Sequence, residues 1–423
     1  MRRRRRRRRR LRVLLVGQCA RRNPPGEGGR PLGLDRDRCV RDHRPGHGRA
    51  VGCAVLQVPG HAAPHRESHR GAARPARAWD RGGRGEAPAT GTGIAYRAAW
   101  WCRNRHLQTI WGALFRRRRL PLRRERVATD DGDFVDLDWS EPAPTSPRDQ
   151  TINPLLLILH GLEGDVRSHY VGGMLREAAA REWRAVVLHF RSCSGELNRL
   201  PRFYHSGDTG DLELVVRRLL EREPDVRLVA AGVSIGGNVL LKWLGEHGKD
   251  APRQLIGAAA ISTPYDLTSC ARALDRGFAR MVYTANFLRS LKAKVRDKAR
   301  VYPDFVDVQA VLRARTFAEY DRALTAPLHG FADERDYWAR ASSKPYLAHV
   351  RRPTLLINAL DDPFVPAGSL PDPKTLPPEI EVEFVADGGH VGFLDGPPWA
   401  LRSWAERCAV AWLADVLERE EHR

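Results

Sequence analysis

Cysteine is scarce in this sequence, and long hydrophobic runs are missing from it. The 423-residue chain holds seven cysteines, an odd number, and no two of them form a Cys-x-x-Cys pair. The cysteines therefore predict neither a disulfide framework nor a structural zinc site, and they favour a reducing, cytoplasmic setting. No stretch approaches the roughly 18 uninterrupted apolar residues that a membrane-spanning helix needs, so no transmembrane segment is expected.

Acidic residues are also in short supply, but only in one part of the chain. The whole sequence has 71 Lys and Arg against 51 Asp and Glu, a net charge of +20. Residues 1–92 contain 24 basic and 7 acidic residues, a net of +17, which leaves +3 for residues 93–423. This basic segment lacks the aromatic interleaving and the motifs of nucleic-acid-binding proteins, so no specific nucleic-acid partner is expected.

The basic segment opens with Met1 and nine arginines and shows no lasting hydrophobic periodicity. Such a composition cannot bury enough apolar surface to offset the entropy of ordering the chain. We expect residues 1–92 to be a disordered Arg-rich tail, or the product of a mis-assigned start codon. A signal peptide is poorly supported, because the apolar run after the arginines is short and is interrupted by Arg12.

Strands and helices alternate along the remainder of the chain. A continuous apolar run predicts a strand at 154–160, and further strands are predicted at 185–190, 227–233, 255–263, 353–360 and 380–387, with helices at 170–183, 209–223 and 235–248. This alternation predicts an α/β fold with a mostly parallel central sheet and helices on both faces. Residues 266–346 read as mainly helical without the strand rhythm, which predicts a helical cap insertion over one end of the sheet. The expected domain spans residues 93–423.

Two segments precede this alternation. The apolar spacing of 105–115 predicts a helix, and 124–139 predicts a β-hairpin around an Asp-Asp-Gly-Asp turn. In the second arm of the hairpin, Asp136 and Asp138 lie on the face opposite Val135, Leu137 and Trp139. The spacing of the aspartates does not fit a calcium-binding EF-hand loop, so we expect them to form a solvated strand face.

Ser234 is an isolated hydroxyl in the apolar stretch 228-LVAAGVSIGGNVLLKWL-244. With Gly232 and Gly236 it forms a G-x-S-x-G motif where a predicted strand runs directly into a predicted helix. Such a sharp turn strains the backbone of the serine and requires neighbours with almost no side chain. It lifts the hydroxyl above the carboxyl edge of the sheet, beside the free N–H groups of the helix. The motif predicts a nucleophilic serine, whereas on its own it also fits a helix N-cap with closely packed glycines.

A serine nucleophile needs a base to take its proton and an acid to orient that base. On a strand-turn-helix motif of this kind, the expected chain order is Ser, then Asp or Glu, then His. Downstream, one predicted strand ends in Asp361 and Asp362, and the next ends at His390 between glycines. With Ala359 in the place of the glycine, Asp362 fits the register G-x-x-D-x-x-x-P that ends at Pro366, which favours it over Asp361 as the orienting acid.

The tetrahedral intermediate of acyl transfer also needs hydrogen-bond donors for its oxyanion. The N–H of Ile235, directly after the serine, is one expected donor. The second is expected from the loop after the first central strand, in 158-ILHGLEGD-165, where the N–H of Leu162 is the natural candidate. His160 in this loop is expected to be structural.

Taken together, these segments resemble the YheT-like branch of the α/β-hydrolases. The matching stretches are RNRHLQTIWGALF, DGDFVDLDW, HGLEGDVRSHYVGGML, FRSCSGELNRLPRFYHSGDTGDL, GVSIGGNVLLKWLGE, LDDPFVP and GGHVGFLDG, and they run from about Tyr96 to the C-terminus. The resemblance implies an α/β-hydrolase fold and a carboxylester hydrolase with a catalytic triad of Ser234, Asp362 and His390. The stretch around Tyr204, His205 and Asp208 has no chemistry that can be assigned from sequence. Shaping of the pocket stays open as a role for these residues, and the role expected is packing and capping of the helix that starts near residue 209.

The sequence therefore predicts a cytoplasmic serine esterase that forms an acyl-enzyme and acts on a small-molecule or lipid ester. Neither an organic cofactor nor a metal is expected, and the sequence indicates no oligomeric state. Two alternatives stay open: an acyltransferase that uses the same triad, and a catalytically silent protein that keeps the fold for binding.

Overall fold

A central sheet organises the computed structural model, which describes residues 94–115, 121–140 and 154–422. Its strands are β1 (Arg123–Ala128), β2 (Phe134–Ser140), β3 (Leu155–Leu159), β4 (Arg184–His189), β5 (Leu228–Val233), β6 (Leu255–Ile261), β7 (Thr354–Ala359) and β8 (Ile380–Val385). They are ordered β1-β2-β4-β3-β5-β6-β7-β8. Every neighbouring pair from β4 to β8 is parallel, whereas β2 is antiparallel to both of its neighbours. The mostly parallel sheet predicted from the sequence is confirmed; the predicted tail, residues 1–92, lies outside the described residues.

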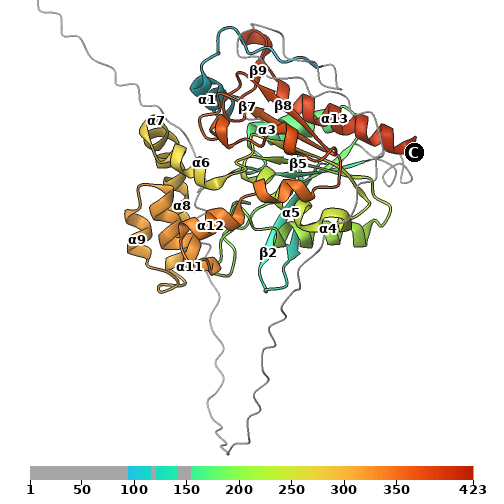
Figure 1. The fold of residues 1–423 in the computed structure, drawn as a ribbon. Coiled ribbons are helices and arrows are strands. Elements are labelled where there is room, and N and C mark those ends of the chain that lie inside the picture. The colour runs from blue at the N-terminus through green and yellow to red at the C-terminus, as the bar shows by residue number, and fades with distance from the viewer. Residues whose placement is uncertain (1–93, 116–120, 141–153, 423) are drawn as a thin grey trace, which may run out of the picture. The chain divides into compact units, whose positions relative to one another are not determined.

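Helices cover both faces of this sheet (Figure 1). Helices α3 (His169–Ala179) and α13 (Trp404–Glu421) pack on one face, and α4 (Gly210–Arg222) and α5 (Ile235–His247) pack on the other. The remaining elements outside the cap are α1 (Arg105–Phe115), the short turns η1 (Gly248–Asp250), η5 (Ala367–Ser369), η6 (Pro373–Thr375) and η7 (Pro398–Ala400), and a small ribbon of β9 (Leu394–Asp395) and β10 (Arg402–Ser403).

The central position of strand β3 explains why its sequence is apolar without alternation. All five of its residues are at most 1% exposed. Leu155, Leu157 and Leu159 pack with α4 and α5, and Leu156 and Ile158 pack with α3 and α13. A strand in the middle of a doubly covered sheet has no solvent side, so both sets of side chains must be apolar. The strand is a rigid support for the loop that follows it.

The segment between β6 and β7 is helical, and we call residues 266–346 the cap segment. Its elements are α6 (Leu267–Leu274), α7 (Gly277–Ala279), η2 (Arg280–Thr284), α8 (Ala285–Ala299), α9 (Val308–Arg313), α10 (Phe317–Tyr320), η3 (Asp321–Thr325), α11 (Ala326–His329) and α12 (Glu334–Ala341), followed by η4 (Lys344–His349). Figure 1 shows these helices together at one end of the sheet. They share a cluster of buried apolar side chains, against which Leu162 from the loop after β3 also packs.

Strands β1 and β2 form the predicted hairpin, but its aspartates are not solvated. Asp136 and Asp138 are only 1% and 4% exposed, so the expected solvated face is wrong. Arg124 donates two hydrogen bonds to Asp138, at 2.7 and 2.8 Å, and Arg126 donates two to Asp136, at 2.8 and 3.0 Å. Because β2 lies inside the sheet, its polar face is covered, and the directly opposite arginines of β1 compensate the buried charges.

The two outermost strands of the sheet carry charges along their length. Strand β1 has the sequence Arg-Arg-Glu-Arg over residues 123–126, and its side chains are exposed or half-buried. Strand β8, at the opposite end of the sheet, carries Glu381 and Glu383.

Candidate active site

Ser234 occupies the sharp turn between β5 and α5. Its backbone has φ 54° and ψ −121°, a conformation that costs a non-glycine residue roughly 1–3 kcal/mol. Its N–H donates to the carbonyl of Ile261 on β6 at 2.8 Å, and its carbonyl accepts the N–H of Asn238 at 3.1 Å. These bonds hold the hydroxyl at the carboxyl edge of the sheet. They also place the N–H of Ile235 in the first helical turn, where a helix offers it no internal acceptor.

The glycines on either side of Ser234 allow this turn because nothing larger fits. A Cβ on Gly232 would lie 2.5 Å from the carbonyl oxygen of Gly236. A Cβ on Gly236 would lie 2.5 and 2.6 Å from the carbonyl oxygens of Leu159 and His160, at the end of β3. Both contacts are with backbone, which cannot move without disturbing the sheet.

We expect Gly236→Ala to destabilise the protein by about 2 kcal/mol or more, because the new methyl group must push β3 away from α5. Chemical unfolding of the purified variant measures this. Gly368→Ala is the matched control, since no atom lies within 4 Å of the Cβ that it adds. Equal stability of the two variants would show that β3 and α5 leave room for a methyl group at position 236.

His390 and Asp362 meet Ser234 at the same edge of the sheet. The Nε2 atom of His390 lies 3.0 Å from Oγ of Ser234, and its Nδ1 atom lies 2.9 Å from Oδ2 of Asp362. The other oxygen of Asp362 accepts the N–H groups of Phe364 and Val365 at 2.7 and 3.2 Å. Because the carboxylate accepts a hydrogen from Nδ1, Nε2 is left as an acceptor for the serine hydroxyl. The structure thus brings together the three residues that the sequence singled out.

Asp361, the other candidate acid, points elsewhere. Its Oδ1 accepts the N–H of Gly389 at 2.8 Å, in the loop that carries His390. Burial, reinforced by the carboxylates of Asp387 and Asp362, raises the pKa of Asp361 to about 6. Asp361 therefore holds the backbone of this loop, while Asp362 holds the imidazole.

The raised pKa of Asp361 gives a stability prediction. Its pKa in the folded state exceeds the ordinary value of 3.8, so its contribution to stability is present at pH 4 and is lost as pH rises through about 6. Asp361→Asn keeps an acceptor for Gly389 but cannot ionise. We expect it to be more stable than the parent by about 1 kcal/mol at pH 7.5, allowing for partial solvation of the carboxylate, with no difference at pH 4.

Urea unfolding across this range measures the difference, and Asp304→Asn, an exposed site, is the control. A constant difference at every pH would contradict the prediction.

The loop after β3 lies beside Ser234 and is held on both sides of Leu162. The N–H of Gly161 donates to the hydroxyl of Tyr170 at 2.8 Å, and the N–H of Glu163 donates to the hydroxyl of Tyr204 at 2.9 Å. A Cβ on Gly161 would come within 3.2 Å of Cβ of Ser234. Since the amides on either side have partners, the N–H of Leu162 is the candidate donor for a ligand next to Ser234.

His160, in the same loop, is buried and neutral. Its Nε2 accepts the N–H of Phe190 at 3.1 Å, so Nδ1 carries the ring hydrogen and donates to the carbonyl of Gly161 at 2.8 Å. Burial lowers the pKa of His160 to about 3, which excludes it as a proton carrier near neutral pH. It ties the end of β3 to the end of β4.

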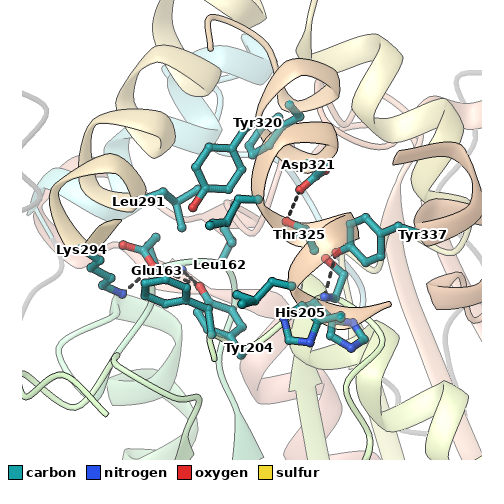
Figure 2. A pocket seen from close by; sticks show the side chains of 16 residues that line it. Leu162, Glu163, Tyr204, His205, Leu291, Lys294, Tyr320, Asp321, Thr325 and Tyr337 are labelled. Atoms are coloured by element: carbon teal, nitrogen blue, oxygen red, sulfur yellow. Dashed lines mark hydrogen bonds and ion pairs between the residues drawn. The ribbon is translucent and has the colours of Figure 1, made fainter. Parts of the chain in front are cut away.

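A cavity of about 70 Å³ lies between this loop and the cap segment (Figure 2). Leu162 and Glu163 line it from the loop, and Leu291, Lys294 and Tyr320 line it from the cap. Leu162 thus belongs both to the cavity and to the loop beside Ser234. The walls combine apolar side chains with the buried ion pair of Glu163 and Lys294 and with other polar side chains, among them His205 and Asp321.

Comparison with known proteins decides the family. The family model described as "alpha/beta hydrolase fold" matches residues 154–397. The chain belongs to the α/β-hydrolase fold family. It is 40% identical over 318 residues to "Putative esterase YheT" of Escherichia coli (strain K12), which covers 74% of this chain and 92% of the relative. It is 31% identical to "Phospholipase ABHD3" of Mus musculus, over 68% of each chain, and 31% identical to "Monoacylglycerol lipase" of Saccharomyces cerevisiae, over 65% of this chain and 61% of the relative.

In this α/β-hydrolase, several residues that support the site were not predicted. Thr109 on α1 accepts the N–H of His390 at 2.9 Å, and the ring of Phe364 stacks on the imidazole with centroids 4.0 Å apart. Tyr170 and Tyr204 hold the loop around Leu162, and Tyr204, for which the sequence predicted only packing, also lines the cavity together with His205. Their only sequence signal was membership of the family-like stretches, because contacts across the fold leave no local pattern.

Cys193 and its neighbours do not form a reactive centre. Burial raises the pKa of the Cys193 thiol to about 12, far from the range of a nucleophilic cysteine. Among residues 94–115, 121–140 and 154–422, no group of three His, Cys, Asp or Glu side chains is placed to hold a metal ion. Within the same ranges, no helix of the hydrolase is both long and apolar enough to cross a membrane.

Proposed function

We propose that this α/β-hydrolase is a serine esterase that cleaves carboxylic esters through an acyl-enzyme. The observation that carries the proposal is the continuous hydrogen-bonded line from Ser234 through His390 to Asp362, at 3.0 and 2.9 Å. Its three members come from turns after three different strands, and the serine is held in a strained turn. Such an arrangement has the geometry of an activated nucleophile, its base and the acid that orients the base.

In the proposed reaction, Oγ of Ser234 attacks the carbonyl carbon of the ester while Nε2 of His390 takes the hydroxyl proton. Asp362 keeps Nδ1 protonated and stabilises the imidazolium that forms. The carbonyl oxygen becomes an oxyanion, which accepts hydrogen bonds from the N–H groups of Leu162 and Ile235. When the intermediate collapses, the C–O bond to the alcohol breaks and His390 gives the proton to the leaving oxygen.

The acyl-enzyme is then hydrolysed by the reverse sequence of roles. A water molecule loses its proton to His390 and attacks the acyl carbon, and Ser234 leaves with that proton. Every step is provided by side chains and backbone groups of this chain, so the proposed mechanism uses neither a metal nor an organic cofactor. Names of relatives include an esterase, a phospholipase and a monoacylglycerol lipase, which supports a small-molecule or lipid ester as the substrate.

The cysteines support the cytoplasmic setting that we propose for the enzyme. Cys102, Cys193, Cys270 and Cys408 are all free and buried. Thiols that remain unpaired are the usual state in a reducing compartment.

Covalent labelling with a fluorophosphonate tests the proposed function directly. We expect the probe to attach to Ser234, identified by mass spectrometry of the labelled peptide, and to block hydrolysis of short-chain p-nitrophenyl esters in proportion to labelling. A folded protein that neither takes the label nor hydrolyses any ester in a panel of acyl lengths would overturn the proposal.

A further inference from the structure

Glu163 has a backbone conformation that its residue type does not favour. Its φ is 55°, in the left-handed region, although it is neither glycine nor asparagine. It directly follows Leu162, whose N–H is the proposed oxyanion donor. A glycine would adopt this conformation without strain, so the side chain of Glu163 must be held by other contacts.

The side chain of Glu163 is buried in an ion pair with the cap segment. Its Oε1 lies 2.6 Å from Nζ of Lys294 on helix α8, and the two side chains are 9% and 15% exposed. The same oxygen accepts a hydrogen bond from the hydroxyl of Tyr204 at 3.1 Å. Figure 2 shows Lys294 reaching down from the cap to Glu163, with Tyr204 beside the pair. A carboxylate this deeply buried is costly to leave without its cation.

The contacts of Glu163 and its neighbours determine where the N–H of Leu162 points. The carbonyl of Gly161 accepts from Nδ1 of His160 and from the N–H of Gly164, at 2.8 and 2.9 Å. Because a trans peptide is planar, this orients the N–H of Leu162 in the opposite direction. The next peptide is oriented by Tyr204, which binds both the N–H and the carboxylate of Glu163.

We propose that Lys294 is a positioning residue for the esterase reaction, acting through Glu163 on the oxyanion loop. The ion pair holds Glu163 in its left-handed conformation only while helix α8 is seated over the loop, so the donor at Leu162 is in place only when the cap is in place. This proposal rests on the proposed function and adds a coupling between the cap and the chemical step.

Lys294→Met removes the cation while keeping most of the side-chain volume. We expect kcat for a short-chain p-nitrophenyl ester to fall about 10- to 100-fold with KM nearly unchanged, since a complete loss of one oxyanion donor typically costs about 10²–10³ in kcat. The dissociation constant of an alkylboronic acid, whose tetrahedral adduct with the serine carries an anionic oxygen, should rise by a similar factor. Lys292→Met is the matched control, because Lys292 lies on the same helix but bonds the carbonyl of Ala314 within the cap.

A glycine at position 163 separates positioning from general loss of structure. Glycine keeps the left-handed backbone without an ion pair, so adding Lys294→Met to Glu163→Gly should change kcat by less than about threefold. A merely structural lysine would cost the same in both backgrounds. Thermal unfolding of all variants identifies any that do not fold, and the Glu163→Gly background remains informative if Lys294→Met alone is unstable.

The outcomes separate the two proposals. Equal kcat and boronic acid affinity for Lys294→Met and Lys292→Met would overturn the positioning role while leaving the esterase intact. An equal loss from Lys294→Met with and without Glu163→Gly would also overturn it. Undiminished hydrolysis by Ser234→Ala would overturn the proposed function and the positioning role together.

Discussion

Ser234→Ala is expected to lower kcat for short-chain p-nitrophenyl esters by at least about 10⁴-fold and to abolish fluorophosphonate labelling. The nucleophile and its base act together, so removal of the nucleophile leaves only the rate acceleration that substrate binding and the oxyanion donors provide. The fold should tolerate the change, because the bonds that hold the turn come from the backbone N–H and carbonyl of residue 234. Steady-state kinetics at matched protein concentration measure the loss.

The matched comparison for this variant is Ser262→Ala. Ser262 also has a positive φ, of 51°, and its hydroxyl accepts the N–H of Val391 at 3.0 Å, next to His390. It is therefore next to the site, with its hydroxyl bonded to the backbone of the loop that carries His390. A larger loss of kcat from Ser262→Ala than from Ser234→Ala would contradict the role assigned to Ser234.

The second large effect is expected from the pair of adjacent aspartates. Asp362→Asn should lower kcat by about 10³–10⁴-fold, because an amide can donate to Nδ1 and stabilise the tautomer whose Nε2 carries the hydrogen. Asp361→Asn should leave kcat within about threefold of the parent, since its oxygen still accepts the N–H of Gly389. The two variants carry the same chemical change at adjacent positions, so each is the control of the other.

Kinetics with p-nitrophenyl butyrate, together with near-UV circular dichroism to verify packing, decide between the two acids. Equal losses of kcat from both substitutions would show that activity depends on the structure of the whole loop and not on the carboxylate bonded to Nδ1. A large loss confined to Asp361→Asn would assign the orienting role to Asp361 instead.

The sheet and the placement of the candidate site followed from the sequence because both depend on local patterns. The runs before Ser234 and Asp362 are apolar, the run before His390 alternates apolar residues with glutamates, and parallel strands bring their carboxyl ends to one edge. The register that favoured Asp362 over Asp361 also agrees with the observed contact between Asp362 and His390.

What the sequence could not provide depends on contacts between distant segments. The aspartates of β2 alternate with apolar residues as in a half-exposed strand, and their burial is explained by partners on the neighbouring strands, the arginines of β1 and His189 of β4. Glu163 reads as an ordinary loop residue, although Lys294, 131 positions later, is its partner. Neither pairing has a signature in the neighbouring sequence.

The charges on the outer strands affect how copies of the protein behave at high concentration. An open sheet has unpaired backbone groups along both ends, which invite extension by a strand from another molecule. Here such a strand would have to strip water from the arginines of β1 at one end or from Glu381 and Glu383 of β8 at the other. The charges on both outermost strands therefore oppose edge-to-edge pairing between copies of the protein, at the two ends of a sheet whose middle strand, β5, leads into Ser234.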